Sequence, residues 1–377
     1  MTAPPTAART SVAIVLPPRE AFSPDATGAV GLVVHLLAGA SPGFAACVLG
    51  LPTPAPFDDV AFRPIRPALR LGGQAGRYAA GVVCALRRAP PALIEVHNRP
   101  DVALHLAQAL PTVPVSLFLH NDPQGMRRAR TPAERRSLLA RLARVVTVSA
   151  WLRGRLLEDV GDGRADVLPN CLDLARLPPP PAARERLILF AGRIVTDKGA
   201  DAFIRACAGA LPRLPGWRAA MLGADRFGAA SPATPYVRRL RQEAAAAGVV
   251  MEGWRPHAEV VAAMGRAAIV VVPSRWPEPF GLTALEAMAS GAALLCAPRG
   301  GLPEVTGDAA VAIDPDDPAS LADAIVALAR DPARQAALGA AGRARAQGFD
   351  VRAAAAALAA LRRDILASWP GRAVPPI

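Results

Sequence analysis

The stretch PEPFGLTALEAMASG, from Pro277 to Gly291, decides the predicted fold. It opens as a loop that contains Glu278 and Gly281, and its pattern then predicts a short helix from Leu282 to Ala289. The preceding residues, 267–274, are apolar and β-branched, which is typical of a buried parallel strand. A strand, a glycine loop and a helix in this order form an anion site, because free backbone N–H groups and the helix dipole face the ligand.

Two carboxylates bracket this predicted anion site. Glu278 lies in the loop and Glu286 lies on the helix that follows it. Anion donors flanked by carboxylates suit a ligand with both phosphate and hydroxyl groups, such as a nucleotide sugar. A structural interpretation also stays open, because Thr283 and Glu286 have the spacing of a helix capping box and Glu278 can be a solvated loop acid.

The same stretch resembles a known family. Glu278-Pro-Phe-Gly-Leu, followed by Leu-Glu286-Ala-Met-Ala-Ser-Gly, is similar to the E-x7-E signature of family 4 glycosyltransferases, which are retaining enzymes of GT-B fold. The resemblance implies that Glu278 meets the donor sugar and that Glu286 binds the nucleotide ribose. It also implies a backbone donor-binding segment made of Phe280, Gly281, Leu282 and Thr283.

A second motif is LILFAGRIVTDKGAD, residues 187–201. An apolar strand ends at Gly192, and Arg193 and Lys198 follow in the loop, where parallel sheets bind ligands. Lys198 is the only lysine among 43 basic residues, so an incidental surface lysine is a poor explanation for it. The motif resembles the G-R-x4-K-G element of the family, which implies that Arg193 and Lys198 bind the donor pyrophosphate and act in catalysis.

Two histidines end consecutive predicted strands of the first half. His120 closes VSLFLH, and the family resemblance places it beside the donor sugar near the reacting carbon. The family often has aspartate after this histidine, whereas Asn121 follows it here. His97 ends the preceding strand and is a candidate for the acceptor side; a purely structural role is the alternative for either residue.

The loop between the first strand and the first helix, residues 17–31, is similar to a glycine-bearing loop of the family. Gly28 is the position at which backbone is expected to approach the donor phosphate or the acceptor. Asp314 and Asp316 have the spacing of a metal-binding D-x-D motif, but they precede a predicted helix and we interpret them as helix-capping residues. Neither a metal nor a cofactor is expected.

The order of elements predicts an α/β protein with two Rossmann-like domains, and the family resemblance implies that they face a central cleft as in the GT-B fold. Strands alternate with helices in both halves, which is the pattern of parallel sheets covered on both faces. The predicted division is an N-terminal acceptor-binding domain over 1–175, a proline-rich linker over 176–184, and a C-terminal nucleotide-sugar domain over 185–348. Residues 349–377 are expected to form a helix that crosses back to the N-terminal domain, followed by a tail.

Composition narrows the class of protein. The net charge is +12, but the basic runs lack interleaved aromatic residues, so nucleic-acid binding is not expected. No apolar run reaches membrane-spanning length, and no secretory signal is visible at the N-terminus, so a cytoplasmic protein is expected. The basic stretch 127–144 combines arginines with leucines and predicts either a packed helix or contact with the inner surface of the membrane.

The expected activity is transfer of a sugar from a UDP-, GDP- or ADP-linked donor to a glycan or glycolipid acceptor, with retention of configuration and without a metal. The N-terminal motifs IEVHNRP and LFLHNDPQ resemble those of bacterial enzymes that build lipopolysaccharide or other surface polysaccharides. Two alternatives remain at this point: a nucleotide-sugar epimerase of the same fold, and a sugar- or membrane-binding scaffold without turnover.

Overall fold

The computed structural model describes residues 9–68, 73–161, 163–179, 181, 183–226 and 231–369. The chain divides into two compact units. Unit 1 comprises Met1–Ser23, Thr27–Asn170 and Val351–Ile377, and unit 2 comprises Pro24–Ala26 and Cys171–Asp350. The C-terminal helix α13 (Val351–Ser368) is thus part of unit 1.

Unit 1 is built on a parallel sheet that has seven strands in the described part of the chain, in the order β3-β2-β1-β4-β5-β6-β7. Its strands are β1 (Thr10–Val15), β2 (Phe44–Gly50), β3 (Phe62–Pro64), β4 (Leu93–His97), β5 (Val115–Leu119), β6 (Arg144–Thr147) and β7 (Asp166–Val167). The strand order reverses at β1, which pairs with both β2 and β4. In open parallel sheets, ligands bind outside the carboxyl ends of the strands at such a reversal.

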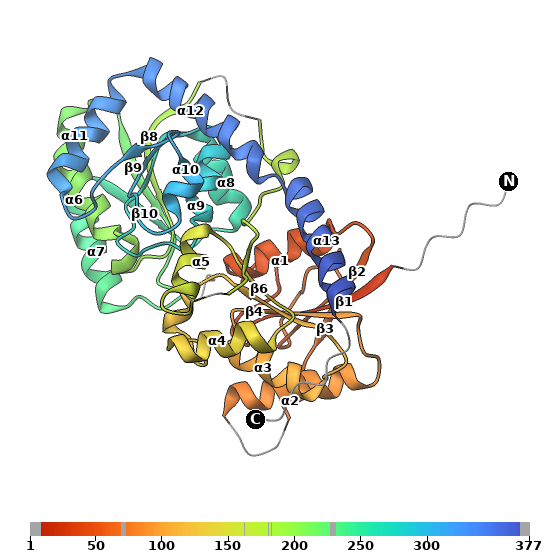
Figure 1. Cartoon of the computed structure of the whole chain (residues 1–377). Helices are drawn as coiled ribbons and strands as arrows, with labels where there is room; N and C mark the ends of the chain where they lie inside the picture. Colours follow the sequence, from red (N-terminus) through yellow and green to blue (C-terminus); the bar gives the residue numbers. More distant parts are fainter. Residues whose placement is uncertain are drawn as a thin grey trace. The chain divides into compact units, whose positions relative to one another are not determined.

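Helices cover both faces of this sheet (Figure 1). Helix α1 (Ala29–Gly39) packs against α13 on one face. The other face carries α2 (Gln74–Arg87), α3 (Pro100–Ala109), α4 (Pro132–Arg141) and α5 (Ala150–Leu157). Helix α4 begins with a complete capping box between Thr131 and Glu134, so the sequence itself sets its first residue.

Unit 2 repeats this design with a parallel sheet of six strands among the residues described, in the order β10-β9-β8-β11-β12-β13. Its strands are β8 (Glu185–Ala191), β9 (Arg218–Leu222), β10 (Val249–Gly253), β11 (Ala267–Val272), β12 (Ala293–Cys296) and β13 (Val311–Ala312). All six residues of β11 are buried, which explains its unbroken apolar sequence. Here the order reverses at β8, which pairs with β9 and β11.

The helices of unit 2 also form two layers (Figure 1). One layer contains α6 (Ala200–Ala210), α7 (Pro235–Ala246) and α11 (Pro318–Ala329). The other contains α8 (His257–Arg266), α9 (Leu282–Ala289), α10 (Leu302–Thr306) and α12 (Pro332–Ala346). Five 3₁₀ turns connect elements in the described residues: η1 (Pro123–Gly125), η2 (Leu174–Arg176), η3 (Thr196–Lys198), η4 (Leu211–Arg213) and η5 (Gln347–Phe349).

The predicted fold class, two parallel-sheet α/β domains, is confirmed. The elements that the sequence did not reveal are β3, β13 and α10, which have three, two and five residues. Such short segments contain too few residues to show a period of two or of 3.6. The predicted linker 176–184 lies partly outside the described residues, as does the tail after Trp369.

The basic stretch 127–144 is less exposed than its sequence indicates. Arg135 lies in the interior of unit 1, where its guanidinium donates to the backbone carbonyls of Leu156 and Glu158 at 2.8 and 2.6 Å. Arg144 is also buried and pairs with Asp166 and with Asp364. These two arginines therefore serve internal contacts in unit 1.

Within the described residues, none of the helices has both the length and the apolar composition that crossing a lipid bilayer requires.

Candidate active site

Lys198 and Glu278, which the sequence places 80 residues apart, form an ion pair in unit 2. The Nζ atom of Lys198 lies 2.5 Å from Oε1 of Glu278. The same carboxylate oxygen accepts a hydrogen bond from the hydroxyl of Ser274 at 2.7 Å. Glu278 is almost fully buried, whereas about a quarter of the Lys198 side chain is exposed. The pair thus places a cation and a hydrogen-bonded carboxylate at the carboxyl edge of the sheet.

Backbone contacts fix the two loops that carry this pair. The carbonyl oxygen of Asp197 accepts hydrogen bonds from the N–H groups of Arg275 and Trp276, at 2.8 and 3.0 Å, and from the hydroxyl of Ser274 at 3.2 Å. Gly199 follows with φ +70°, and a Cβ atom there would lie 1.8 Å from the carbonyl oxygen of Pro273. Only glycine allows the two loops to come this close.

Arg193 lies in the same loop as Lys198, just after β8 ends at Ala191. Its side chain is exposed, in contrast to the strand residues before it. The G-R-x4-K-G segment therefore delivers both of its basic residues to the carboxyl edge of β8. Their role as phosphate-binding cations stays a prediction, and this position is compatible with it.

The predicted backbone donor segment surrounds the start of α9. Gly281 is the N-cap residue of the helix, with φ +103°, and as a glycine it has no side chain with which to cap the first turn. The N–H groups of Leu282 and Thr283 belong to that first turn, where a helix has no acceptors of its own. Phe280 is buried and packs edge-to-face against Phe349, and this contact holds the turn against the interior of unit 2.

Glu286 forms a contact that the sequence did not indicate. Its Oε1 atom lies 2.7 Å from Nε2 of His257, the first residue of α8. Burial lowers the pKa of His257, but the hydrogen bond and the charge of Glu286 outweigh it, so the pKa is raised. The alternative interpretation of Thr283 and Glu286 as a capping box is wrong, because the N-cap residue of α9 is Gly281 and Thr283 lies inside the helix. His257 opens a helix with no recognisable motif, and 29 residues separate it from Glu286.

A glycine turn at residues 300–301 holds the backbone of Glu278. Gly300 forms a parallel bridge with Glu278, and the N–H of Gly301 donates to the carbonyl of Glu278 at 2.6 Å. Gly300 has φ +69°, and a Cβ atom there would lie 2.3 Å from that carbonyl oxygen. The Gly300-Gly301 pair thus fixes the backbone on which the Glu278 side chain stands.

Unit 2 also has a cavity of about 140 Å³ at the carboxyl ends of β9 and β10. Its walls include Gly223, Asp225, Met251, Gly253 and Trp254. None of these residues was singled out from the sequence, because they come from the end of β10 and from loops without a recognised motif.

His120 belongs to unit 1 and lies at the carboxyl end of β5. Its Nε2 atom lies 2.9 Å from Nδ1 of His97, and the two rings are stacked. Burial lowers the pKa of His120 to about 4 and also lowers that of His97, so both rings are neutral at pH 7. The Oδ1 atom of Asn98 accepts hydrogen bonds from the backbone N–H groups of His120 and Asn121, at 2.7 and 3.2 Å. The two candidate histidines are therefore one coupled pair.

Gly28 precedes α1 in unit 1, and its backbone N–H is already in use. It donates to Oε1 of Glu20 at 2.7 Å, and the N–H of Gly31 donates to the same atom at 2.9 Å. Burial raises the pKa of Glu20. A carboxylate from the same loop thus takes the anion position at the start of α1, and sequence reasoning missed it because Glu20 stands outside any motif.

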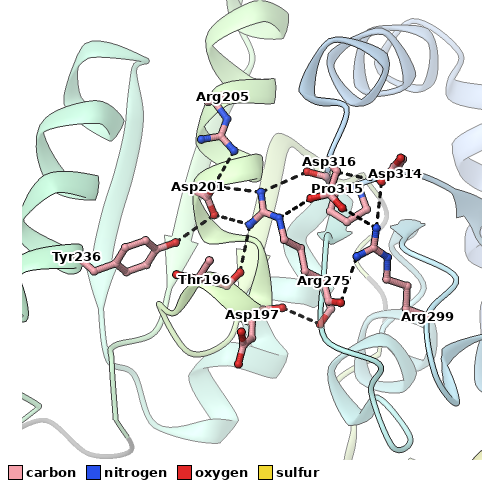
Figure 2. A network of polar contacts seen from close by, with 11 residues as sticks. Thr196, Asp197, Asp201, Arg205, Tyr236, Arg275, Arg299, Asp314, Pro315 and Asp316 are labelled. Atoms are coloured by element: carbon pink, nitrogen blue, oxygen red, sulfur yellow. Dashed lines mark hydrogen bonds and ion pairs between the residues drawn. The ribbon is translucent and has the colours of Figure 1, made fainter.

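Asp314 and Asp316 are not helix-capping residues, contrary to the sequence interpretation. Asp317 caps α11 through a bond from the Ser320 N–H. Both other aspartates accept hydrogen bonds from Arg299, at 3.3 and 2.7 Å. Figure 2 shows that they belong to a wider network of charges.

Known families match both halves of this chain. Residues 177–345 match the family described as Glycosyl transferases group 1, and residues 30–176 match Glycosyltransferase Family 4. A D-inositol 3-phosphate glycosyltransferase of Corynebacterium diphtheriae is 38% identical over 155 residues, which are 40% of this chain and 36% of that protein. A glycogen synthase of Mycobacterium tuberculosis is 32% identical over 200 residues, which are 50% of this chain and 46% of that protein. The matched stretches thus span at most about half the length of these curated relatives.

Solved structures match the whole fold. Sucrose-phosphate synthase from Thermosynechococcus elongatus has a TM-score of 0.77 at 20% identity and covers 96% of this chain and 100% of its own. HepE from Anabaena, solved in complex with UDP-glucose, has a TM-score of 0.73 at 20% identity, covering 95% of this chain and 100% of its own. At this identity the likeness establishes the fold.

Proposed function

The chain belongs to glycosyltransferase family 4, and we propose that it transfers a sugar from a nucleoside diphosphate sugar to a saccharide or glycolipid acceptor with retention of configuration. The observation that carries this proposal is the Lys198–Glu278 ion pair beside the uncapped start of α9. This observation supports the proposal, because a cation, a carboxylate and backbone N–H donors are the groups that a sugar and its diphosphate need.

In the proposed reaction, the bond between the sugar's anomeric carbon and the diphosphate oxygen breaks. A bond forms from the acceptor hydroxyl oxygen to the same face of that carbon, and the hydroxyl proton moves to the departing phosphate oxygen. Arg193, Lys198 and the N–H groups of Leu282 and Thr283 stabilise the charge that develops on the diphosphate. Preorganised charge of this kind is usually the largest catalytic contribution. Because these donors already carry the charge, the proposal includes no metal and no cofactor.

Glu278 and Glu286 bind the hydroxyl groups of the donor in this proposal. Glu278 receives the sugar, and Glu286 receives the ribose through the carboxylate oxygen that His257 leaves unused. We propose that the nucleotide base binds in the cavity near Trp254. That cavity lies at the carboxyl edge of the sheet, as the Lys198–Glu278 pair does. The Anabaena protein HepE, which shares the fold, was solved with UDP and glucose.

We assign the acceptor to unit 1, with His120 as its candidate catalytic residue. His120 is neutral and is hydrogen-bonded to His97, so in this proposal it contributes an uncharged, oriented imidazole ring. Unit 1 also has a cavity of about 280 Å³, whose walls carry Arg127, Arg128 and Arg141 and also the carboxylates of Asp101 and Glu134. The proposed acceptor is a surface polysaccharide or lipopolysaccharide intermediate, and the sequence motifs around His97 and His120 are what supports it.

A cytoplasmic location, with peripheral contact to the membrane, completes the proposal. Such contact would depend on Arg136 and on the exposed arginines before Thr131, because Arg135 and Arg144 are buried.

A transfer assay tests the proposed function. UDP-, GDP- and ADP-linked hexoses are incubated with the protein and with acidic or neutral oligosaccharide acceptors, and proton NMR reads the anomeric configuration of the product. We expect one nucleotide class to be consumed only when acceptor is present, with the donor's anomeric configuration retained.

Three results would contradict this function. Epimerised sugar and free nucleotide from donor alone would favour the epimerase, an inverted product would exclude retention, and tight sugar binding without turnover would favour the scaffold. The control is Lys198→Ala, which we expect to transfer sugar about 10²–10³ times more slowly.

A further inference from the structure

A network of charged side chains lies beside the candidate donor site and contains none of the residues assigned to the donor (Figure 2). Its centre is Arg275, whose Nη1 and Nη2 atoms donate to the two carboxylate oxygens of Asp201 at 2.7 and 3.1 Å. The Nε atom of Arg275 donates to Asp316 at 2.7 Å. One guanidinium thereby connects α6 to the segment after β13.

A second arginine extends the network to another loop. Arg299, in the loop after β12, donates to Asp316 at 2.7 Å and to the backbone carbonyl of Arg275 at 3.2 Å. Asp201 accepts two further hydrogen bonds, from the hydroxyl of Tyr236 at 3.1 Å and from Nη2 of Arg205 at 2.6 Å. Each carboxylate oxygen of Asp201 thus accepts two hydrogen bonds.

The charges in this network neutralise one another. Burial opposes ionisation of Asp201, but the hydrogen bonds from Arg275 and Arg205 outweigh burial and lower the pKa of Asp201 to about 2. The hydrogen bonds that Arg275 donates to Asp201 raise the pKa of Arg275. Arg275 uses all three guanidinium nitrogens within the protein, so its function lies in the contacts that it makes there.

The backbone of Arg275 belongs to the loop that carries Glu278. Its N–H donates to Asp197, the residue before Lys198, and its Nη1 atom donates to the carbonyl of Thr196 at 3.2 Å. A shift of the guanidinium would therefore move the Glu278 loop relative to the Lys198 turn. The network fixes the distance between the two groups that the proposed function places on sugar and diphosphate.

A contribution to folding stability does not explain why this site contains a network of charges. Replacing a buried ion pair by apolar side chains of similar volume is often neutral or stabilising, because removing charges from water is costly. A compact ammonium at position 275 could not reproduce the contacts, since a guanidinium forms a planar fork that binds a carboxylate through two parallel bonds. The requirement is therefore one of geometry.

From these contacts we infer that Arg275 is a positioning residue, which with Asp201 and Asp316 sets the spacing of Lys198 and Glu278 for a donor diphosphate. The inference rests on the proposed function, because it assigns the diphosphate to these two residues. Arg275 touches no reacting atom in this account and acts only through the two loops.

Calorimetry with matched ligands tests this role. The titrants are UDP, GDP and ADP and the corresponding nucleosides, which lack the phosphates. The proteins are wild type, Arg275→Lys and Asp316→Asn; Asp316 is half exposed, so its substitution leaves the fold intact. The matched control is Arg213→Gln, which removes an exposed ion pair with Asp323 in the same unit.

We expect Arg275→Lys to weaken binding of the preferred nucleoside diphosphate at least tenfold, with the nucleoside affinity unchanged. Asp316→Asn should weaken diphosphate binding by a smaller factor than Arg275→Lys does, and Arg213→Gln should bind the diphosphate with wild-type affinity. A merely structural role would lower nucleoside and diphosphate affinity together. That result, or wild-type diphosphate affinity in Arg275→Lys, overturns the inference.

The two proposals fail in different ways. If wild type binds none of the three diphosphates, the proposed function falls and the positioning role falls with it. If wild type binds one of them and both network variants bind it equally well, only the positioning role is lost.

Discussion

At the scale of single residues, the site depends on groups with a defined chemical identity. Lys198 is the only lysine in the chain, and it reaches a carboxylate that is also bonded to Ser274. An ammonium is a compact point charge, whereas a guanidinium needs room for its planar fork. The position is therefore specific for lysine and not merely for positive charge.

Replacement of Lys198 should separate charge from shape. We expect Lys198→Ala to lower kcat of sugar transfer by about 10²–10³, the usual effect of removing one donor to a developing negative charge. Lys198→Arg should restore little of this loss. Steady-state rates at saturating donor measure the effect, and full activity of Lys198→Arg would contradict the account.

His257 and Glu286 give the site a dependence on pH. Because Glu286 raises the pKa of His257, the ion pair stabilises the folded protein fully below the ordinary histidine value of 6.5. The contribution is lost as pH rises through the raised pKa. Since about two-fifths of the His257 side chain is exposed, solvent and salt screen the effect.

We therefore expect wild type to melt at a higher temperature than His257→Gln at about pH 6, with the difference vanishing at alkaline pH. Thermal melts across this range at low salt measure it. A difference that stays constant with pH would show that His257 contributes packing instead of charge.

At the scale of elements, glycines determine how closely the site loops approach. Two independent features require glycine at position 199. The backbone there is left-handed, and a Cβ atom would collide with the carbonyl oxygen of Pro273. We expect Gly199→Ala to cost more than the roughly 1–2 kcal/mol of a left-handed residue alone, because the loops must also separate.

The matched control is Gly265→Ala in α8, where a Cβ atom meets nothing within 4 Å. Alanine there should be neutral or stabilise the helix by about 0.5–1 kcal/mol. Urea unfolding of both variants makes the comparison. Equal stability of the two variants would refute the proposed close approach.

Helix α13 is fixed to unit 1 by a buried ion pair. Arg362 is fully buried and donates to both carboxylate oxygens of Glu95 at 2.8 and 2.7 Å, and to Ser41 at 2.7 Å. We expect Arg362→Met to cost about 3–5 kcal/mol, because Glu95 is left as an uncompensated buried charge.

The double variant Arg362→Met/Glu95→Leu should recover most of that loss, since it removes both charges. Chemical denaturation of the full chain provides the values. If the double variant is no more stable than the single one, the helix is fixed by packing and not by the ion pair.

At this scale the sequence was informative where the signal is local. The alternation of strands and helices, the end of β8 at the G-R-x4-K-G segment and the start of α9 were all predicted from neighbouring residues. The contacts of Glu20 with Gly28, of His257 with Glu286 and of Arg275 with Asp201 were not. These pairs join segments that only the folded chain brings together, and no spacing rule connects their members.

At the scale of the whole molecule, two units of the same architecture carry different chemistry. Unit 1 has a neutral histidine pair at the carboxyl ends of β4 and β5. Unit 2 gathers the cation, the carboxylates and the helix start at its own sheet edge. The division supports an acceptor side and a donor side, which is the core of the proposed function.

Calorimetric titration of wild type and Glu286→Gln with UDP, GDP and ADP, without metal, tests the central claim most directly. The account predicts that wild type selects one nucleotide and that Glu286→Gln binds it at least tenfold more weakly, because one ribose contact is lost. Wild type that binds none of the three, or equal affinity in the variant, would contradict the assignment of unit 2 as the donor site.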